Sequence, residues 1–188
     1  MQFNPEIFKA YDIRGLVRGD LSEELAYRIG RAFVAYLRSS SNLHEDQSIV
    51  VGRDMRESGP ALAVAVMKGI QDEGVNVTDI GLTSTPLFNF ACANFPEHAG
   101  GIMVTASHNP AEYNGFKLTL GSGLPIGRGN GMEAVRDLTE QNDFVNQEKH
   151  GEIQARDVFP EYQQRIFELV EPGAVKPLKI VIDAGNGM

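Results

Sequence analysis

The stretch that decides the fold is residues 48–82, which read SIVVGRDMRESGPALAVAVMKGIQDEGVNVTDIGL. The β-branched run Ser48–Gly52 is typical of a strand. Ser58 and Pro60 then open a segment whose apolar residues recur every four positions, which predicts a helix. A second strand-like run, Val75–Gly81, follows this helix. The order strand, helix, strand predicts an α/β fold in which helices cover a sheet.

Elements of the same two kinds extend to both sides of this stretch. Before it, Ser22 is placed to cap a helix that has an apolar stripe. After it, Asn114-Gly115 indicates a turn that leads into a strand. The other expected elements are a helix from Thr85 to before Pro96, strands at Gly101–Ala106 and Phe116–Leu120, and a helix from Met132 to Glu140. The predicted fold is α/β, with a mixed, mostly parallel sheet sandwiched by helices.

The chain divides into two parts of unequal length. Residues 1–150 are predicted to form an N-terminal α/β domain, and the polar stretch Gln141–Gly151 is interpreted as a linker. Residues 151–188 contain an expected helix, Phe159–Val170, and a strand, Leu178–Ile182, that leads into a turn. Because one strand buries little surface, this part is interpreted as the truncated start of a second α/β domain.

Composition narrows the classes of partner. The formal net charge of −8 argues against nucleic acid, which needs a basic face, but a small phosphorylated ligand needs only a local cluster of cations. No apolar run approaches the roughly 18 residues of a membrane span. Cys92 is the single cysteine, which favours the reducing cytoplasm. The sequence does not determine the oligomeric state.

Polar surroundings predict surface positions for His44, His98 and His150. The segment Gly129–Ala134 fits a loose dinucleotide-binding pattern, but it does not follow directly on a strand, so we give it little weight. The sequence has no Walker A motif and no Cys/His spacing typical of a metal site.

The run Thr105–Pro110, TASHNP, carries the strongest chemical signal. It follows a predicted buried strand, and ligands of α/β proteins gather at the carboxyl ends of strands. Ser107 is therefore a candidate reactive group, and His108 can offer a proton or a positive charge. An ordinary polar loop with an Asn-Pro turn is the alternative.

Three further features have both a functional and a structural interpretation. In Tyr11–Gly15, Arg14 can grip a phosphate through two hydrogen bonds, but the five residues alone fit an exposed turn better. In Gly52–Arg56, two arginines and one aspartate can contact phosphate, although an ion-pair network that braces a loop is favoured. Lys117 is a candidate general base or else a surface lysine.

Together these segments resemble the α-D-phosphohexomutase family. The resemblance rests on Phe8–Gly15, Gly52–Arg56, Thr105–Pro110, Tyr113–Lys117 and Ile182–Gly187, and it covers essentially the whole chain. The form of Tyr11–Gly15 favours the phosphomannomutase/phosphoglucomutase branch over the phosphoglucosamine mutases.

The resemblance implies a reaction and a set of roles. Ser107 would carry a phosphoryl group and donate it to a hexose monophosphate. The resulting bisphosphorylated sugar would reorient and return its other phosphate, so that mannose or glucose 1-phosphate and 6-phosphate interconvert. Lys117 resembles the general base, whereas Tyr11, Arg14 and His108 resemble residues that bind and orient the reacting groups.

The resemblance also implies Mg²⁺, which in this family bridges the phosphoserine and three aspartates. Here Ser107 would contribute through its phosphate, and the aspartates would lie beyond Met188. The sugar-recognition loop and the C-terminal phosphate-binding domain would lie there too, so we expect residues 1–188 alone to lack mutase activity. The expected partners are small sugar phosphates, with a sugar bisphosphate as activator and intermediate. The alternatives are a phosphoglucosamine mutase, a non-catalytic phosphate-binding or regulatory module, and a purely structural domain.

Overall fold

The structure is a computed structural model that describes residues 3–145, 147–170, 173 and 176–185. The strands are β1 (Ile13–Leu16), β2 (Ser48–Arg53), β3 (Asn76–Leu82), β4 (His98–Val104), β5 (Tyr113–Leu120) and β6 (Ile153–Ala155). The helices are a short 3₁₀ turn, η1 (Pro5–Ile7), and α1 (Glu23–Ser39), α2 (Gly59–Asp72), α3 (Thr85–Asn94), α4 (Met132–Gln141) and α5 (Phe159–Leu169). In the part of the chain that the structure describes, no helix is long and apolar enough to cross a membrane.

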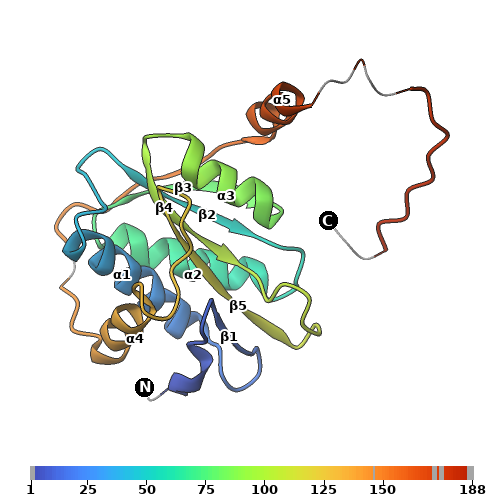
Figure 1. Ribbon diagram of the computed structural model, residues 1–188. Coiled ribbons are helices and arrows are strands. Elements are labelled where there is room, and N and C mark those ends of the chain that lie inside the picture. Colours follow the sequence, from blue (N-terminus) through green and yellow to red (C-terminus); the bar gives the residue numbers. More distant parts are fainter. Residues whose placement is uncertain (1–2, 146, 171–172, 174–175, 186–188) are drawn as a thin grey trace.

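The strands form one sheet in the order β1-β5-β4-β2-β3-β6. β2 runs parallel to β3 and β4, and β3 runs parallel to β6. β5 is antiparallel to both of its neighbours, β1 and β4. Helices α1, α2 and α4 lie on one face of the sheet, and α3 lies on the other (Figure 1). The predicted mixed, mostly parallel sheet between helices is confirmed.

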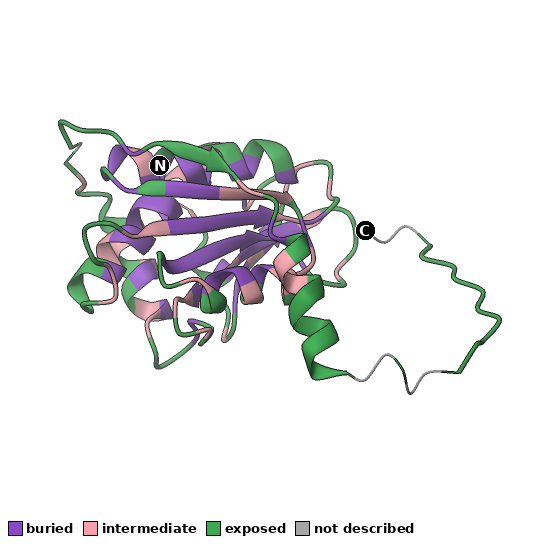
Figure 2. Cartoon of the chain, turned by 90° about the horizontal axis from the view of Figure 1, so that it is seen from above, coloured by how far each residue is buried: buried purple, intermediate pink, exposed green. Residues whose placement is uncertain are grey.

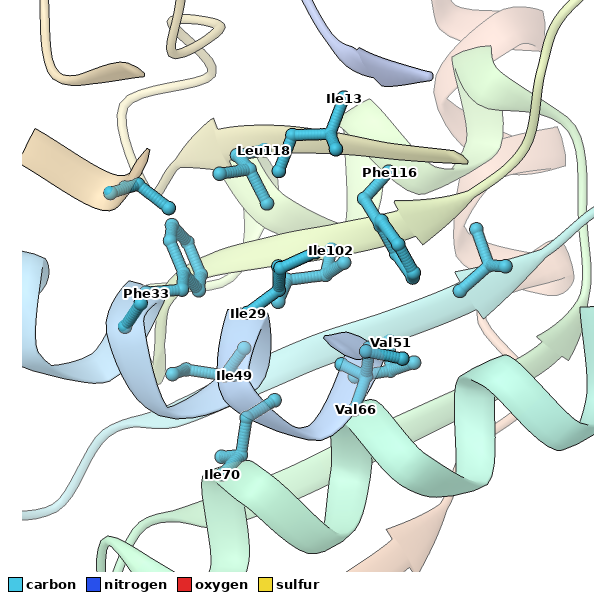
Figure 3. Close-up of a cluster of buried hydrophobic side chains, with 14 of the residues drawn as sticks. Ile13, Ile29, Phe33, Ile49, Val51, Val66, Ile70, Ile102, Phe116 and Leu118 are labelled. Carbon is cyan, nitrogen blue, oxygen red and sulfur yellow. The ribbon is translucent and has the colours of Figure 1, made fainter. Parts of the chain in front are cut away.

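Alternating side chains of β2 divide the core into two layers. Ile49 and Val51 belong to the large cluster under α1 and α2, whereas Val50 faces Phe88 of α3. Figure 3 shows the large cluster, in which apolar side chains of both helices meet those of the central strands. This two-sided burial explains why β2 is an uninterrupted apolar run rather than an alternating one.

Close backbone contact sets how the two largest helices pack. A Cβ atom on Gly30 would meet the carbonyl of Val66, and one on Gly69 would meet the carbonyl of Tyr27. Each helix therefore presents a glycine to the backbone of the other. The predicted cap of α1 is confirmed, because the Ser22 side chain accepts a hydrogen bond from the Leu25 amide at 3.1 Å.

Two local predictions near the N-terminal edge of the sheet were wrong. Residues Ile13–Leu16 form β1 rather than an exposed turn, and Asn114-Gly115 lies inside β5 rather than in a turn. Gly115 pairs with Arg14, and a Cβ atom there would overlap the carbonyl of Ile13. Gly115 therefore allows the backbones of β1 and β5 to approach closely. The Asn-Gly sequence alone indicated a turn instead.

One histidine prediction also failed. His98 is 3 % exposed, because it begins the buried strand β4 and its Nδ1 lies 2.6 Å from the carbonyl oxygen of Ala91. His44 and His150 are exposed, as predicted.

The C-terminal part differs from the expectation in two ways. The expected strand Leu178–Ile182 is wrong: these residues are exposed and unpaired, because a strand-forming segment without a neighbouring strand has no hydrogen-bond partners to hold it. The last two residues of the expected turn, 186–187, lie outside the described residues. The predicted helix is present as α5, whose exposed surface stands out in Figure 2. It contacts α3 through Tyr162 and Phe90, whose ring centroids are 5.3 Å apart.

Candidate active site

The five residues that the sequence singled out lie in one cleft. Tyr11, Arg14, Ser107, His108 and Lys117 line an open cavity of about 790 Å³. They come from β1, from β5 and from the loops that precede β1 and follow β4.

The register of the sheet explains how residues so distant in sequence meet. Phe116 of β5 pairs with Ile13 of β1 on one side and with Val104 of β4 on the other. The beginning of β1 therefore lies level with the end of β4. The loop that carries Ser107 and the strand that carries Arg14 consequently open into the same cleft.

Ser107 sits in an unusual backbone conformation at the mouth of this cleft. Its φ angle is 55°, in the left-handed region that side chains disfavour, and the residue is exposed. Its amide donates to Thr105 Oγ1 at 2.9 Å, and the Thr105 hydroxyl donates to Asp54 Oδ2 at 2.6 Å. A buried carboxylate thus anchors the serine loop to the end of β2.

Arg56 stabilises the same loop through hydrogen bonds to its backbone. Its guanidinium donates to the carbonyl oxygens of Ser107, Asn109, Pro110 and Tyr113 and to the Asp54 carboxylate. The structural interpretation of Gly52–Arg56, a network that braces a loop, is therefore confirmed. Arg56 contacts the backbone of the site rather than the open space in front of it.

Asp12, which is not among the predicted site residues, organises the cations of the cleft. Its buried carboxylate forms an ion pair with Arg14 and lies 3.6 Å from Lys117 Nζ. Arg14 also donates through Nη1 to Asn109 Oδ1 at 2.7 Å, which links β1 to the serine loop. The position of Asp12 between Tyr11 and Ile13 in the quoted motif was the only signal that could have revealed it.

The cleft holds charged side chains of both signs in a chain with net charge −8. Lys9, Arg14, His108 and Lys117 all line it. The carboxylates of Glu6, Asp12 and Asp20 line it too. Arg14 and Lys117 share the cleft with Ser107 and offer charged donors to an anion such as a phosphate group.

The cleft offers few ligands for a divalent cation. The described residues contain no group of three or more histidine, cysteine, aspartate or glutamate side chains that could hold a metal ion. Asp12 is already paired with Arg14 and Lys117, and the Ser107 hydroxyl is a single oxygen donor. A phosphoryl group on Ser107 would add three hard oxygens of the kind that Mg²⁺ prefers.

Comparison with known proteins gives a consistent result. The family model described as phosphoglucomutase/phosphomannomutase, alpha/beta/alpha domain I, matches residues 5–146. A phosphomannomutase of Vibrio cholerae serotype O1 is 42% identical over 180 residues, which are 96% of this chain and 38% of that protein. A phosphoglucomutase of Neisseria meningitidis serogroup A is 40% identical over 187 residues, 97% of this chain and 38% of that protein.

Solved structures agree with the sequence relatives. A phosphoglucomutase/phosphomannomutase family protein from Burkholderia thailandensis superposes with a TM-score of 0.77 at 34% identity, covering 89% of this chain and 36% of the other. The chain therefore spans well under half the length of the relatives that it matches.

Proposed function

Since the chain belongs to the phosphoglucomutase/phosphomannomutase family, we propose that it is the part of a phosphohexomutase that carries the transferred phosphoryl group. The reaction interconverts hexose 1-phosphate and hexose 6-phosphate through a bisphosphorylated sugar. One observation carries the proposal: an exposed serine with a left-handed backbone faces a cleft lined by Arg14, His108 and Lys117. Relatives are named for mannose and for glucose, so both sugars belong to the proposal.

Ser107 Oγ is the phosphoryl carrier in this mechanism. The bond between phosphorus and Oγ breaks while a hydroxyl oxygen of the sugar phosphate forms a new bond to phosphorus. In the second half-reaction, the reoriented bisphosphate returns its other phosphoryl group to Oγ. Such transfers depend on in-line positioning and on cations that offset the charge of the equatorial oxygens.

The side chains of the cleft take separate roles. Lys117 is the general base, which takes the proton of the attacking hydroxyl and returns it in the reverse direction. Arg14 is held by Asp12 and Asn109 and orients phosphate oxygens. His108, next to the carrier, stabilises negative charge, and Tyr11, which is 79% exposed, contacts the sugar phosphate at the rim.

Mg²⁺ is part of the proposal, with the phosphate of Ser107 as the ligand that this chain supplies. Bound there, the ion would offset the charge of the phosphoryl oxygens. Its remaining ligands would come from residues outside 1–188. We accordingly propose that residues 1–188 alone do not turn over sugar phosphates.

The proposal keeps the division of the chain at residue 150. Two observations support it: the family's first-domain model ends at residue 146, and α5 has no buried residue. The pairing of β6 with β3 attaches residues 153–155 to the first sheet, so the connection between the two parts begins on that sheet. A reducing cytoplasm is the proposed compartment, because Cys92 is buried as a free thiol.

A coupled assay of a full-length protein that contains this chain tests the function. With Mg²⁺ and a priming sugar bisphosphate, we expect turnover of mannose 1-phosphate or glucose 1-phosphate. Ser107→Ala should lower kcat at least about 10³-fold, since the nucleophile is lost. Ser39→Ala, at an exposed serine on α1, is the matched control and should match the wild type.

Each other outcome has a defined meaning. Full activity of Ser107→Ala would reject the serine as carrier. A wild-type protein without turnover would favour a non-catalytic phosphate-binding module, and a preference for glucosamine phosphate would favour the phosphoglucosamine mutases.

A further inference from the structure

We propose that Arg56 is a positioning residue whose guanidinium holds Ser107 in its left-handed conformation and thereby places Oγ in the cleft. The conformational part of this inference stands on the geometry alone. Its consequence for catalysis rests on the proposed function.

Arg56 has a hydrogen-bond partner for every N–H group of its guanidinium. Nε donates to Asp54 at 3.2 Å, and Nη1 donates to Pro110 at 2.7 Å and Tyr113 at 2.9 Å. Nη2 donates to the carbonyls of Ser107 at 3.0 Å and Asn109 at 2.7 Å. Since a guanidinium has five N–H donors, Arg56 retains none for a phosphate. Its side chain is also only 8% exposed, so it cannot serve as a ligand of the substrate.

Arg56 closes a ring of hydrogen bonds around Ser107. The Ser107 carbonyl accepts from Arg56, and the Ser107 amide donates to Thr105 Oγ1. Asp54 Oδ2 completes the ring, because it accepts from both Thr105 Oγ1 and Arg56 Nε. Both backbone polar groups of Ser107 are therefore fixed from opposite sides of its Cα atom. This ring can hold the φ angle of Ser107 at 55°. A serine in an unconstrained loop would adopt a negative φ angle instead.

Arginine is required at this position for a geometric reason. Its planar fork reaches four carbonyl groups and one carboxylate at once. A lysine ammonium has three donors on one atom, so it cannot span the same acceptors. Arg56→Lys therefore keeps the charge and removes the ring.

The first experiment measures the backbone of Ser107 by NMR in residues 1–188. The one-bond Cα–Hα coupling separates positive from negative φ. We expect the wild type to show positive φ, and Arg56→Lys and Thr105→Val to lose it. Thr105→Ser restores the hydroxyl and should restore positive φ. Arg136→Lys is the matched control, because Arg136 forms its ion pair with Asp137 on α4 and does not line the cleft.

The second experiment measures steady-state kinetics in the full-length protein. A displacement of a reacting atom by about 1 Å costs on the order of 100-fold in rate. We expect Arg56→Lys and Thr105→Val to lower kcat by about that factor while KM changes less than about 2-fold. Thr105→Ser should recover most of kcat, and Arg136→Lys should match the wild type.

The two experiments separate the possible failures. Positive φ retained in both Arg56→Lys and Thr105→Val overturns the inference, as does a lost positive φ with unchanged kcat. If Arg56→Lys does not fold, Thr105→Val opens the same ring from the other side and decides the question. A wild-type protein without turnover rejects the proposed function and, with it, the catalytic role of Arg56, while the NMR result still decides the conformational role.

Discussion

Gly101 offers a sharp test of how helix α3 packs on the sheet. A Cβ atom at this position would lie 2.7 Å from Cys92 Sγ, from Phe88 Cε2 and from the Val50 carbonyl oxygen. Real Cβ contacts essentially never fall below 3.0 Å. Phe88 and Cys92 are fully buried on α3, so neither side chain can swing into solvent. Gly101→Ala must therefore push α3 away from β4.

Two opposing contributions set the size of the effect. Adding a methylene to a packed core costs about 1–3 kcal/mol, and three simultaneous overlaps favour the upper end. Alanine regains about 0.5–1 kcal/mol, because glycine is intrinsically unfavourable in a strand. We expect a net loss of about 2 kcal/mol in the free energy of unfolding. For a chain of this length, that corresponds to a fall in Tm of about 4–8 °C.

Urea unfolding followed by circular dichroism measures this loss, and Gly59→Ala is the matched control. Gly59 is also buried, but the nearest atom to its added Cβ is the Asp54 carbonyl oxygen at 3.5 Å, an ordinary contact. The control should be neutral or stabilised by up to about 1 kcal/mol. Equal stability of Gly101→Ala and Gly59→Ala would refute the packing argument.

A double mutant identifies the atoms responsible. Cys92→Ala removes the sulfur that the new methyl group would meet, so it should relieve part of the strain. The cycle formed by Gly101→Ala and Cys92→Ala should then show a favourable coupling of at least about 0.5 kcal/mol. Strict additivity would mean that the strain lies elsewhere.

Three further predictions follow from buried groups. Burial raises the pKa of Asp72, but hydrogen bonds from Lys68, Tyr27 and His150 outweigh it, so the pKa of this carboxyl is lowered. The ionised Asp72 carboxylate therefore stabilises the fold above about pH 4, and this contribution is lost as pH falls through the lowered pKa. Asp72→Asn should lower the free energy of unfolding, measured in urea at pH 7, by about 2 kcal/mol, and this difference should disappear in acid. Asp137→Asn, which removes one partner of an exposed ion pair, should lower it little. Burial lowers the pKa of His98. The neutral ring therefore stabilises the fold above about pH 6.5, and this contribution is lost as pH falls through the lowered pKa. In thermal melts, the Tm of His98→Gln should depend less on pH in that window than the Tm of the wild type. Burial raises the pKa of the Cys92 thiol, so labelling by a thiol reagent should proceed at the unfolding rate, and rapid labelling of the native protein would contradict this.

Local patterns predicted most of the elements that build the sheet. β2, α1 and α2 form as predicted. Each of these elements buries the apolar side chains whose spacing predicted it. The five predicted site residues also share one cleft. Their individual roles stay predictions.

Other features were invisible to local patterns. β1 is only four residues long and contains Arg14 and Gly15, so its sequence does not predict a strand. It is a strand because β5 provides its hydrogen-bond partners. His98 was predicted at the surface because it directly follows Pro96 and Glu97 in the sequence. Its burial comes from Ala91 of α3 and from Phe95, which directly follows that helix.

The sequence by itself determined the fold class, the order of the main helices and strands, and the motifs that identify the family. All of these depend on residues a few positions apart, whose spacing the helix and the strand fix. Only the tertiary structure decided that Asp12 pairs with both Arg14 and Lys117, and that Arg56 supports the loop of Ser107. The contacts of Asp12 with Lys117 and of Arg56 with Ser107 join residues tens of positions or more apart. The pairing of β1 with β5 and of β2 with β4 brings these residues together, which no local pattern encodes.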